Sequence, residues 1–453
     1  MKKIIVAVLL VSGTIQLSAQ KGWYSLFDGK TFNGWKKVAG AADYIIENNT
    51  IIGVTVPKTP NTFLLTDKIY NDFILELEVK IDDNHTNSGI QFRSNYDPNE
   101  GNGKGKLFGY QFELDPSPRA WTGGIYDEAR RGWLYPLDLN SFARTAYKSG
   151  QFNKVRIECK GPVTQTFLNG TPAAILVDTL NTAGYIALQV HGIGANPKGG
   201  QKIYWKNIRI NTSDVKLSPV KNVYVVNNLP NNLSDVEKKQ GWTLLFDGKT
   251  TRGWRSAKDK GFPTKGWHIE NGELKVLSSN GAESANGGDI ITNNEYAAFD
   301  LTFQFKLTPG ANSGVKYYVT LKEQSQGSAI GPEYQILDDQ LHPDAKLGKD
   351  GNRTLASLYD LIASKKDARA FKPIGQWNTG RIQARKDGQV TYFLNGIPLV
   401  DFVRGSEAFR KLVAGSKYKD WSRFGEASKG HILLQDHGNE VSFRSIKIKD
   451  LSK

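Results

Sequence analysis

FILELEVKI at residues 73–81 and FDLTFQFKL at residues 299–307 decide the fold class of this chain. In each segment apolar residues alternate with mostly polar ones, so every second side chain faces the same way. This period of two is typical of a strand with one face in a core and the other toward solvent or a ligand. It is the strongest periodicity in either half, so we expect an all-β chain.

The two segments belong to a duplicated domain. SLFDGKTFNGW at 25–35 recurs as LLFDGKTTRGW at 244–254. Three further pairs keep this order: NSG at 87–89 and 312–314, LNG at 168–170 and 394–396, and QVHG at 189–192 with QDHG at 435–438. A period of more than 200 residues indicates two domains rather than a solenoid. The offset grows from 219 to 246 residues, which marks loop insertions in the second copy.

Many short strands, glycine-rich turns and about 200 residues per copy predict a two-sheet sandwich in each half. VVNNLPNNLSD at 225–235 has the turn chemistry of a linker. We therefore expect a first sandwich at 20–212, a linker at 213–240 and a second sandwich at 241–453. The helical signal is thin, and SEAFRKLVAG at 406–415 predicts a short helix from its Ser start and Gly stop.

Residues 1–19 have the features of a secretory signal peptide. Lys2 and Lys3 precede an apolar run, and the small Ala19 offers a cleavage site. We expect export across the inner membrane to the periplasm. No membrane insertion is expected, because no later segment is long and uncharged enough to span a bilayer.

Composition argues against nucleic-acid binding and against cysteine-based stabilisation. The formal net charge is +14, but Lys and Arg are scattered and no nucleic-acid motif is present, so we expect a basic soluble surface and no nucleic-acid partner. Cys159 is the single cysteine, which excludes an internal disulfide and a cysteine-based zinc cluster.

Polar residues inside strand-like segments mark candidate sites in both copies. GYQFELD at 109–115 puts Gln111 and Glu113 on one face, and GPEYQILDD at 331–339 does the same for Glu333 and Gln335. Such side chains are costly to bury without a partner or a task. A solvent-facing row is the structural alternative.

Two further repeated positions carry chemistry. LQVHG at 188–192 and LQDHG at 434–438 place a Gln and a His on one side of a strand, and the recurrence of His191 and His437 favours a functional role. Arg93 and Lys316 follow the Asn-Ser-Gly turns as candidate cations, with pairing to the carboxylates as the structural alternative.

The copies diverge most in one loop. LHPDAKLGKDGNRTLASLYDLIA at 341–363 is long and rich in His, Asp, Arg and Tyr, as loops that carry sites often are. The first copy has the shorter RAWTGGIYDEAR at 119–130, whose Trp121 is either a stacking platform for a sugar or a core aromatic. The second copy is therefore expected to hold the main chemical site.

Taken together, these motifs resemble the 3-keto-disaccharide hydrolase family, a former domain of unknown function. The resemblance covers both copies and is carried by LFDGKTFNGW, the NSG turn, the Gly...Glu/Gln...Asp strand, the Tyr-Asp pair, QWN, LNG and LLQDHGNEVSFRSIKIKDL. It implies two tandem concanavalin A-like, or jelly-roll, β-sandwich domains. It also implies an enzyme that cleaves 3-keto-glycosides or 3-keto-disaccharides supplied by a separate 3-dehydrogenase. The first copy fits less well, and either binds glycan or walls the cleft.

The implied reaction is an elimination. A ketone at C3 acidifies the proton on C2, a base removes it, the enolate expels the oxygen at C1, and water addition gives net hydrolysis. In this hypothesis His437 or Glu333 is the base, Lys316 or a divalent metal held by carboxylate and His stabilises the enolate, and Tyr359 or Asp338 is the acid. The remaining candidates bind substrate: Gln335, Gln435, Arg353, His342 and Asp339 in the second copy, and Arg93, Gln111, Glu113, His191 and Trp121 in the first. Metal ligands stay unassigned.

A second hypothesis belongs to another class: a non-catalytic, lectin-like protein with two glycan-binding sandwiches. Duplication supports it too, since paired modules raise avidity. The asymmetric loop at 341–363 favours the enzyme, because two equivalent binding modules would not require it.

Overall fold

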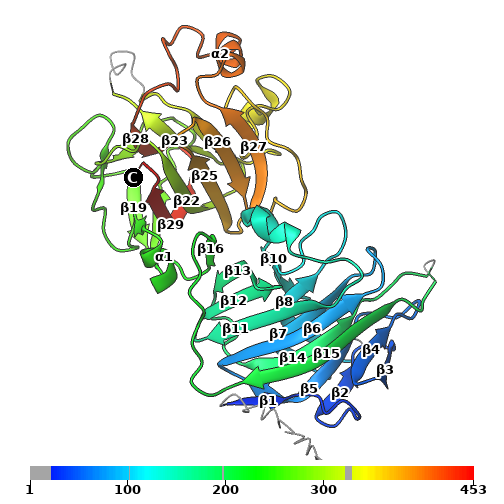
Figure 1. Cartoon of the computed structure of the whole chain (residues 1–453). Helices are drawn as coiled ribbons and strands as arrows, with labels where there is room; N and C mark the ends of the chain where they lie inside the picture. The colour runs from blue at the N-terminus through cyan, green and yellow to red at the C-terminus, as the bar shows by residue number, and fades with distance from the viewer. Residues whose placement is uncertain (1–21, 102, 196–197, 322–328, 453) are drawn as a thin grey trace, which may run out of the picture.

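The computed structural model describes residues 22–101, 103–195, 198–321 and 329–452, and it contains two jelly-roll β-sandwiches in tandem (Figure 1). The expected all-β class and the duplication are confirmed. The signal peptide expected at 1–19 lies outside the described residues. Within the described ranges, no helix has the length and apolar character needed to cross a bilayer.

The first domain pairs a nine-stranded sheet with a seven-stranded one. The larger sheet runs in the order β16-β13-β12-β11-β6-β15-β4-β3, with β1 beside β15. Its strands are β1 (Trp23–Ser25), β3 (Asp43–Glu47), β4 (Thr50–Val54), β6 (Phe73–Ile81), β11 (Asn153–Lys160), β12 (Val163–Leu168), β13 (Thr171–Val177), β15 (Lys202–Asn211) and β16 (Val225–Asn227). The smaller sheet runs β10-β9-β8-β7-β14-β5-β2. Its strands are β2 (Trp35–Val38), β5 (Thr62–Tyr70), β7 (Ser88–Asp97), β8 (Lys106–Leu114), β9 (Ile125–Glu128), β10 (Gly132–Tyr135) and β14 (Gly184–Val190), and the 3-10 turns η1 (Leu137–Leu139) and η2 (Ser141–Thr145) follow β10.

The second domain repeats this plan with an eight-stranded and a five-stranded sheet. The larger sheet runs β19-β20-β29-β22-β25-β26-β27, with β17 beside β29. Its strands are β17 (Trp242–Leu244), β19 (Trp267–Glu270), β20 (Glu273–Val276), β22 (Phe299–Leu307), β25 (Asn378–Ala384), β26 (Gln389–Leu394), β27 (Ile397–Val403) and β29 (Val441–Asp450). The smaller sheet runs β18 (Trp254–Ser256), β21 (Ile290–Thr292), β28 (His431–Leu434), β23 (Asn312–Val319) and β24 (Glu333–Leu337).

The alternating apolar residues that predicted the fold form the cores of the two domains. In β6 the apolar set from Phe73 to Ile81 is at most 2% exposed, and the matching set of β22, from Phe299 to Leu307, is equally buried. Burying a Phe, Leu, Ile or Val side chain stabilises the fold by about 1.5–3 kcal/mol. These two strands therefore anchor the two cores.

The repeated LFDGK stretch is a structural corner in both domains. Asp28 accepts hydrogen bonds from the backbone N–H groups of Lys30 and Thr31, and Asp247 closes the same turn in the second copy. Trp35 donates its indole N–H to the Leu26 carbonyl at 2.6 Å, and the pairing recurs at Trp254. The motif repeats because each sandwich begins at this corner.

The linker is more ordered than its composition indicates. β16 pairs in parallel with β13 and extends the sheet of the first domain. Residues Asp235–Lys239 form α1, which begins at a capping box between Ser234 and Glu237. Asn231 reaches into the second domain and donates to the Gly272 carbonyl at 2.8 Å. The linker is thus ordered by pairing with the edge of a strand and by a capped helix, and its periodicity predicts neither the strand nor the helix.

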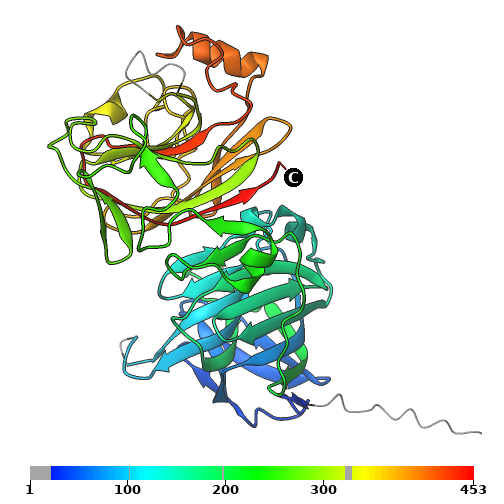
Figure 2. The ribbon, with the colours of Figure 1, turned by 90° about the vertical axis from the view of Figure 1, so that its left-hand side faces the viewer.

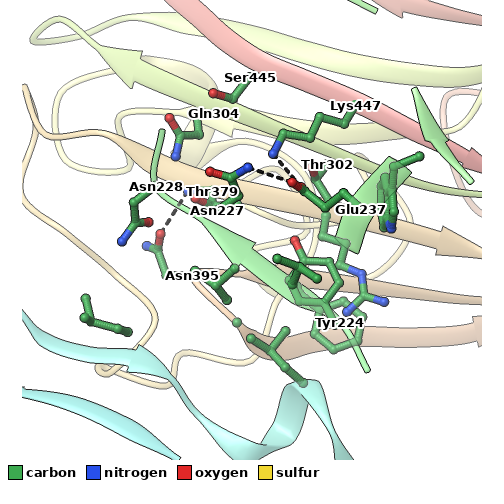
Figure 3. Close-up of a pocket in the computed structure, with 18 of the residues that line it drawn as sticks. Tyr224, Asn227, Asn228, Glu237, Thr302, Gln304, Thr379, Asn395, Ser445 and Lys447 are labelled. Carbon is green, nitrogen blue, oxygen red and sulfur yellow. Dashed lines mark hydrogen bonds and ion pairs between the residues drawn. The ribbon is translucent and has the colours of Figure 1, made fainter. Parts of the chain in front are cut away.

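A crevice of about 100 Å³ lies where the linker and the first domain meet the larger sheet of the second domain (Figure 3). Glu237 accepts from Lys447 at 2.7 Å and from Asn227 at 2.6 Å within it. Arg381, on its wall, is paired with Asp300 in the neighbouring strand. Because these charges satisfy one another, the crevice is a domain contact and not the candidate site.

The expected helix at 406–415 is confirmed as α2 (Glu407–Ala414), which begins after the Ser406 cap. It lies in the insertion between β27 and β28, residues 404–430, which we call the arm. Figures 1 and 2 show the arm at the end of the second domain that faces away from the first.

Candidate active site

A polar cavity of about 310 Å³ opens on the five-stranded sheet of the second domain, and we call it the pocket. It contains six of the residues predicted from the sequence: Lys316, Glu333, Gln335, Tyr359, Gln435 and His437. All of its lining residues among those the structure describes belong to the second domain. The expectation that the first copy walls the cleft is therefore not supported by the described lining.

A group of one ammonium and two carboxylates lies at the pocket, and Lys316 and Glu333 of this group line the cavity. The antiparallel register of β23 and β24 places Lys316 opposite Glu333. Lys316 Nζ lies 4.0 Å from a carboxylate oxygen of Glu333 and 4.0 Å from one of Asp289. All three side chains are largely buried. At 4.0 Å the charges attract without a closed hydrogen bond.

Burial sets the protonation of this group. Loss of solvent raises the pKa of Glu333 above its usual value, although nearby Lys316 opposes the shift. Burial also raises the pKa of Asp289. Burial alone would lower the pKa of Lys316, but Glu333 and Asp289 together raise it, so the ammonium stays charged. A carboxylate with a raised pKa beside a fixed cation is a common arrangement for proton abstraction.

Polar atoms without partners face the same site. Gln435 Oε1 and His437 Nδ1 are buried and find no hydrogen-bond partner among the described residues. A buried polar atom left unpaired costs about 1–3 kcal/mol. In the orientation that satisfies its amide, Gln335 donates to Glu333 at 3.3 Å and to the Ser313 carbonyl at 3.1 Å. Gln435 and His437 are thus free to meet the hydroxyl groups of a ligand.

Tyr359 is held in the pocket by a network in the long loop. Its hydroxyl donates to Asp344 at 2.8 Å. Arg353 donates to Asp344 at 3.0 Å and to Asp360 at 2.6 Å, with its guanidinium 5.3 Å from the Tyr359 ring centre. Burial, followed by Asp344, raises the pKa of Tyr359 above its usual value. Arg353, expected to bind substrate, instead positions Tyr359.

The sequence predictions missed three pocket residues on the arm: Lys417, Tyr418 and Trp421. The Lys417 ammonium lies 4.2 Å from the Tyr359 ring centre. Although the residue is exposed as a whole, desolvation lowers the pKa of Lys417. The jump in repeat offset from 226 at LNG to 246 at the Gln-x-His position marks this insertion and could have revealed it.

Besides Arg353, three predicted residues of the second domain lie outside the pocket lining. Asp338 accepts from the backbone of Gly310 at 2.8 Å and so fixes the start of the long loop. Asp339 accepts from the Leu355 backbone at 2.6 Å. His342 caps the turn η4 (Pro343–Lys346), and its ring packs edge-on against His437 at 5.6 Å. These placements favour Tyr359 over Asp338 as the acid of the pocket.

Arg93 is the counterpart of Tyr318 and not of Lys316. A β-bulge follows Gln91 in β7, with Arg93 at φ 47°, and a matching bulge follows Lys316 in β23, with Tyr318 at φ 51°. The bulge turns Arg93 away from the concave face. Its guanidinium instead donates to the Asn71 and Gly161 carbonyls and pairs with Asp72.

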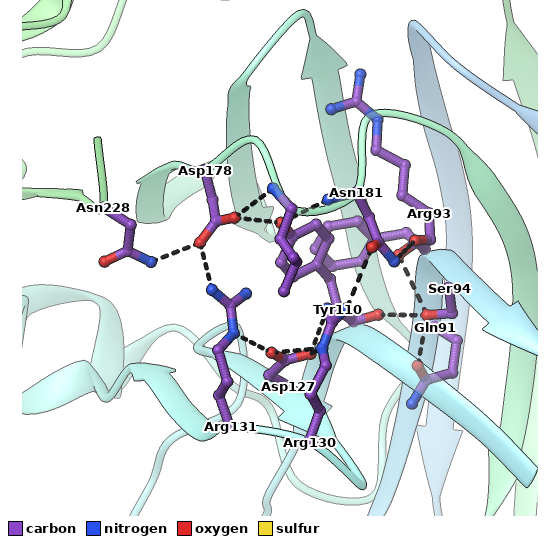
Figure 4. A network of polar contacts seen from close by, with 12 residues as sticks. Gln91, Arg93, Ser94, Tyr110, Asp127, Arg130, Arg131, Asp178, Asn181 and Asn228 are labelled. Carbon is purple, nitrogen blue, oxygen red and sulfur yellow. Dashed lines mark hydrogen bonds and ion pairs between the residues drawn. The ribbon is translucent and has the colours of Figure 1, made fainter. Parts of the chain in front are cut away.

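Gln91, whose contact with Ser94 is shown in Figure 4, occupies the place of Lys316 in the first domain. It accepts from Ser94 at 2.7 Å and donates to Gln111, which stands opposite it where the second domain has Glu333. Gln111 donates in turn to Glu113 at 2.8 Å. A chain of neutral amides thus replaces the ion pair.

The remaining candidates of the first domain are placed differently from one another. Burial raises the pKa of Glu113 to about 7, against hydrogen bonds from Asn87 and Gln111. The solvent-facing alternative for this strand face is therefore wrong, since Gln111 and Glu113 are buried. His191 is exposed beside the Gly192 carbonyl. Trp121 is 1% exposed and packs edge-on against Trp133, so it cannot stack on a sugar.

A metal role finds no ready ligand set in the part of the chain that the structure describes. There, no group of three or more His, Cys, Asp or Glu side chains is arranged to hold an ion.

Comparisons with known proteins identify the family of the chain. The model of the 3-keto-alpha-glucoside-1,2-lyase-like domain matches residues 22–211 and again residues 241–449. A 3-keto-disaccharide hydrolase of Bacteroides thetaiotaomicron is 37% identical over 232 residues, which cover 47% of this chain and 79% of the relative. Two crystal structures of putative glycosyl hydrolases from Parabacteroides distasonis are 30% and 26% identical, with TM-scores of 0.42 and 0.36. They cover 49% and 46% of this chain and 100% and 99% of their own. With both copies matched, the chain belongs to the family of 3-keto-alpha-glucoside-1,2-lyase-like domains and carries that domain twice.

Proposed function

We propose that the second domain cleaves 3-keto-glycosides or 3-keto-disaccharides in the pocket. The observation that carries the proposal is the buried group of Lys316, Glu333 and Asp289 on the concave sheet of a domain of this family. The named relative is a 3-keto-disaccharide hydrolase, which supports the same substrate class. Glycosidic bond cleavage is thus the reaction class.

The first step is removal of the C2 proton. A C3 ketone makes this proton acidic, and Glu333 accepts it, since burial raises the pKa of this carboxyl and so makes the carboxylate a stronger base. The electron pair of the C2–H bond moves into the enolate, whose negative charge lies on the C3 oxygen. Lys316 stabilises that oxygen as a fixed cation.

The second step breaks the bond at C1. The enolate re-forms the C3 ketone, a double bond forms between C1 and C2, and the C1–O bond breaks. Tyr359 gives its phenolic proton to the leaving oxygen, since its raised pKa keeps the phenol protonated at neutral pH. Water then adds its hydroxyl to C1 and returns a proton to Tyr359, while Glu333 returns its proton to C2. The sum is hydrolysis.

The reaction depends on a supply of the oxidised substrate and takes place in a particular compartment. The C3 ketone must be installed by an oxidoreductase that acts on the intact glycoside, so a 3-dehydrogenase is the proposed supplier. We further propose that the protein works in the periplasm after export, on the strength of the leader-like residues 1–19.

The test mixes the purified protein with a 3-keto-glycoside and with its unoxidised parent, with and without a chelator, and follows aglycone release. We expect cleavage of the ketone alone. Binding of either sugar without cleavage would favour the lectin-like alternative, and equal cleavage of both would contradict the elimination. A chelator that abolishes the activity would assign the enolate to a metal rather than to Lys316.

The matched pair His437→Ala and His191→Ala locates the chemistry, because the two residues occupy one repeat position. We expect loss of activity only for His437→Ala. Equal losses would contradict the assignment to the second domain.

A further inference from the structure

A second cavity of about 350 Å³ lies beside the pocket, on the arm, and we call it the groove. Its walls are Arg410 and Val413 of α2, together with Arg423, Phe424 and Glu426. Trp421 lines the groove and also the pocket. The two cavities therefore meet at one partly exposed indole.

A pair of stacked rings stands between the two cavities. Tyr418 and Phe424 lie with their ring centres 3.9 Å apart and their planes within 12°. Tyr418 lines the pocket and Phe424 lines the groove. Both rings are buried, so the partition is a rigid wall.

The arm is an addition that the first domain lacks. Six residues, 178–183, join β13 to β14 there, whereas residues 404–430 join the equivalent strands β27 and β28. Only the second domain carries the Lys316–Glu333 pair, and only there does the insertion occur. The groove therefore occurs only in the domain that has the charged pocket.

The groove has the chemistry of a carbohydrate subsite. The partly exposed Trp421 offers an apolar face for the C–H groups of a pyranose ring, and the buried Phe424 forms part of the groove wall. Arg410 holds Glu426 at 2.8 Å, while the Arg423 side chain is 79% exposed and lies 3.6 Å from the same carboxylate. Arg423 thus keeps donors for sugar hydroxyls. The pocket and the groove each have a volume at the lower end of the range for small-molecule sites, which suits one sugar ring in each.

We propose that the groove binds the leaving sugar of a disaccharide while the pocket holds the oxidised ring. This inference rests on the proposed function. It adds that the protein favours disaccharides over glycosides with a small aglycone, and that the arm sets this preference.

The test compares two substrates that share the oxidised ring: a 3-keto-disaccharide and the methyl 3-keto-glycoside. Val413→Trp fills the groove, and Leu412→Trp puts the same bulk on a neighbouring position of α2 that is 39% exposed and outside the groove lining. We expect Val413→Trp to raise KM for the disaccharide at least about tenfold and to leave the methyl glycoside unchanged. Arg423→Ala should act in the same direction with a smaller effect, and Leu412→Trp should change neither.

Equal effects of Val413→Trp on both substrates, or no effect on either, would overturn the subsite. If the unmodified protein cleaves neither ketone, the proposed function fails on its own. Calorimetry with the disaccharide and the monosaccharide then tests whether the groove binds a sugar. Loss of disaccharide affinity in Val413→Trp but not in Leu412→Trp supports the subsite, and unchanged affinity in Val413→Trp rejects it.

Discussion

Replacement of Lys316 by Met tests the charge arrangement most directly. Methionine keeps most of the unbranched side chain and removes the cation. At 4.0 Å from a carboxylate, one unit charge is worth about 4 kcal/mol with an effective dielectric constant of about 20. The enolate would lose a comparable contact, and loss of one oxyanion donor costs about 10²–10³ in kcat. We therefore expect kcat of Lys316→Met to fall about 10²–10³-fold.

The same substitution should move the pH profile in a fixed direction. Lys316 attracts the Glu333 carboxylate and so holds its pKa below the value that burial alone would set. Without that charge the pKa of Glu333 rises further, because burial is then less opposed. Because the base must be ionised, the acid limb of the kcat/KM profile shifts to higher pH.

The control is Lys429→Met, which removes an exposed ion pair with Glu295 elsewhere in the second domain. Stopped assays from pH 4 to pH 9, with melting curves to confirm folding, provide the comparison. A folded Lys316→Met variant with the unmodified rate and the unmodified acid limb would refute the role of this lysine.

Three further outcomes follow from the structure. Glu113→Gln should raise the melting temperature above pH 7 and leave it unchanged below pH 4.5. Burial raises the pKa of Glu113 from its ordinary 4.5 to about 7 in the folded protein, so stability is lost as the pH rises from 4.5 through 7, by up to about 3 kcal/mol. An unchanged melting temperature at pH 8 would contradict the burial of this charge. Gly314→Ala should lower kcat, because its Cβ would lie 2.1 Å from the Glu333 carboxylate, while the matched Gly89→Ala presses on Gln111 and should spare activity. Equal rates in the two variants would exclude the β23–β24 face from the chemistry. Arg353→Ala should reduce kcat about tenfold. The double variant Arg353→Ala/Tyr359→Phe should have a kcat little lower than that of Tyr359→Phe alone, because residues of one hydrogen-bond network do not act additively. Fully additive losses of kcat would show that Arg353 acts independently of Tyr359.

Period and repeat were enough to predict most of the fold. The alternation in β6 and β22 identifies strands with one buried face, because successive side chains of a pleated strand point to opposite faces of the sheet. The Ser406 cap predicted α2 for an equally local reason. The order within the linker depends on partners elsewhere, β13 for β16 and Gly272 for Asn231, and no local pattern reports them.

The candidate site was predictable where the motif and the strand face coincide, as at Glu333 and Gln335 of β24. Gln435 and His437 were found through their repeated motif, although they follow the end of β28 at Leu434 and do not lie on a strand. Arg93 was expected to bind substrate, and the alternation of the strand does not report the bulge after Gln91 that turns its side chain away from the concave face. The arm residues could not be assigned to the pocket, since only the packing of a long insertion brings them there.

Strand β16 has a consequence for how the chain can be divided. It covers the edge of β13, so a first domain cut at residue 212 would present an open strand to any neighbour and favour aggregation. A cut after Asn228 keeps that strand, and keeps the amide that donates to Asp178 at 2.6 Å. The unit to be handled alone therefore ends inside the stretch that joins the two sandwiches, about seventeen residues beyond β15, the last strand of the repeat itself.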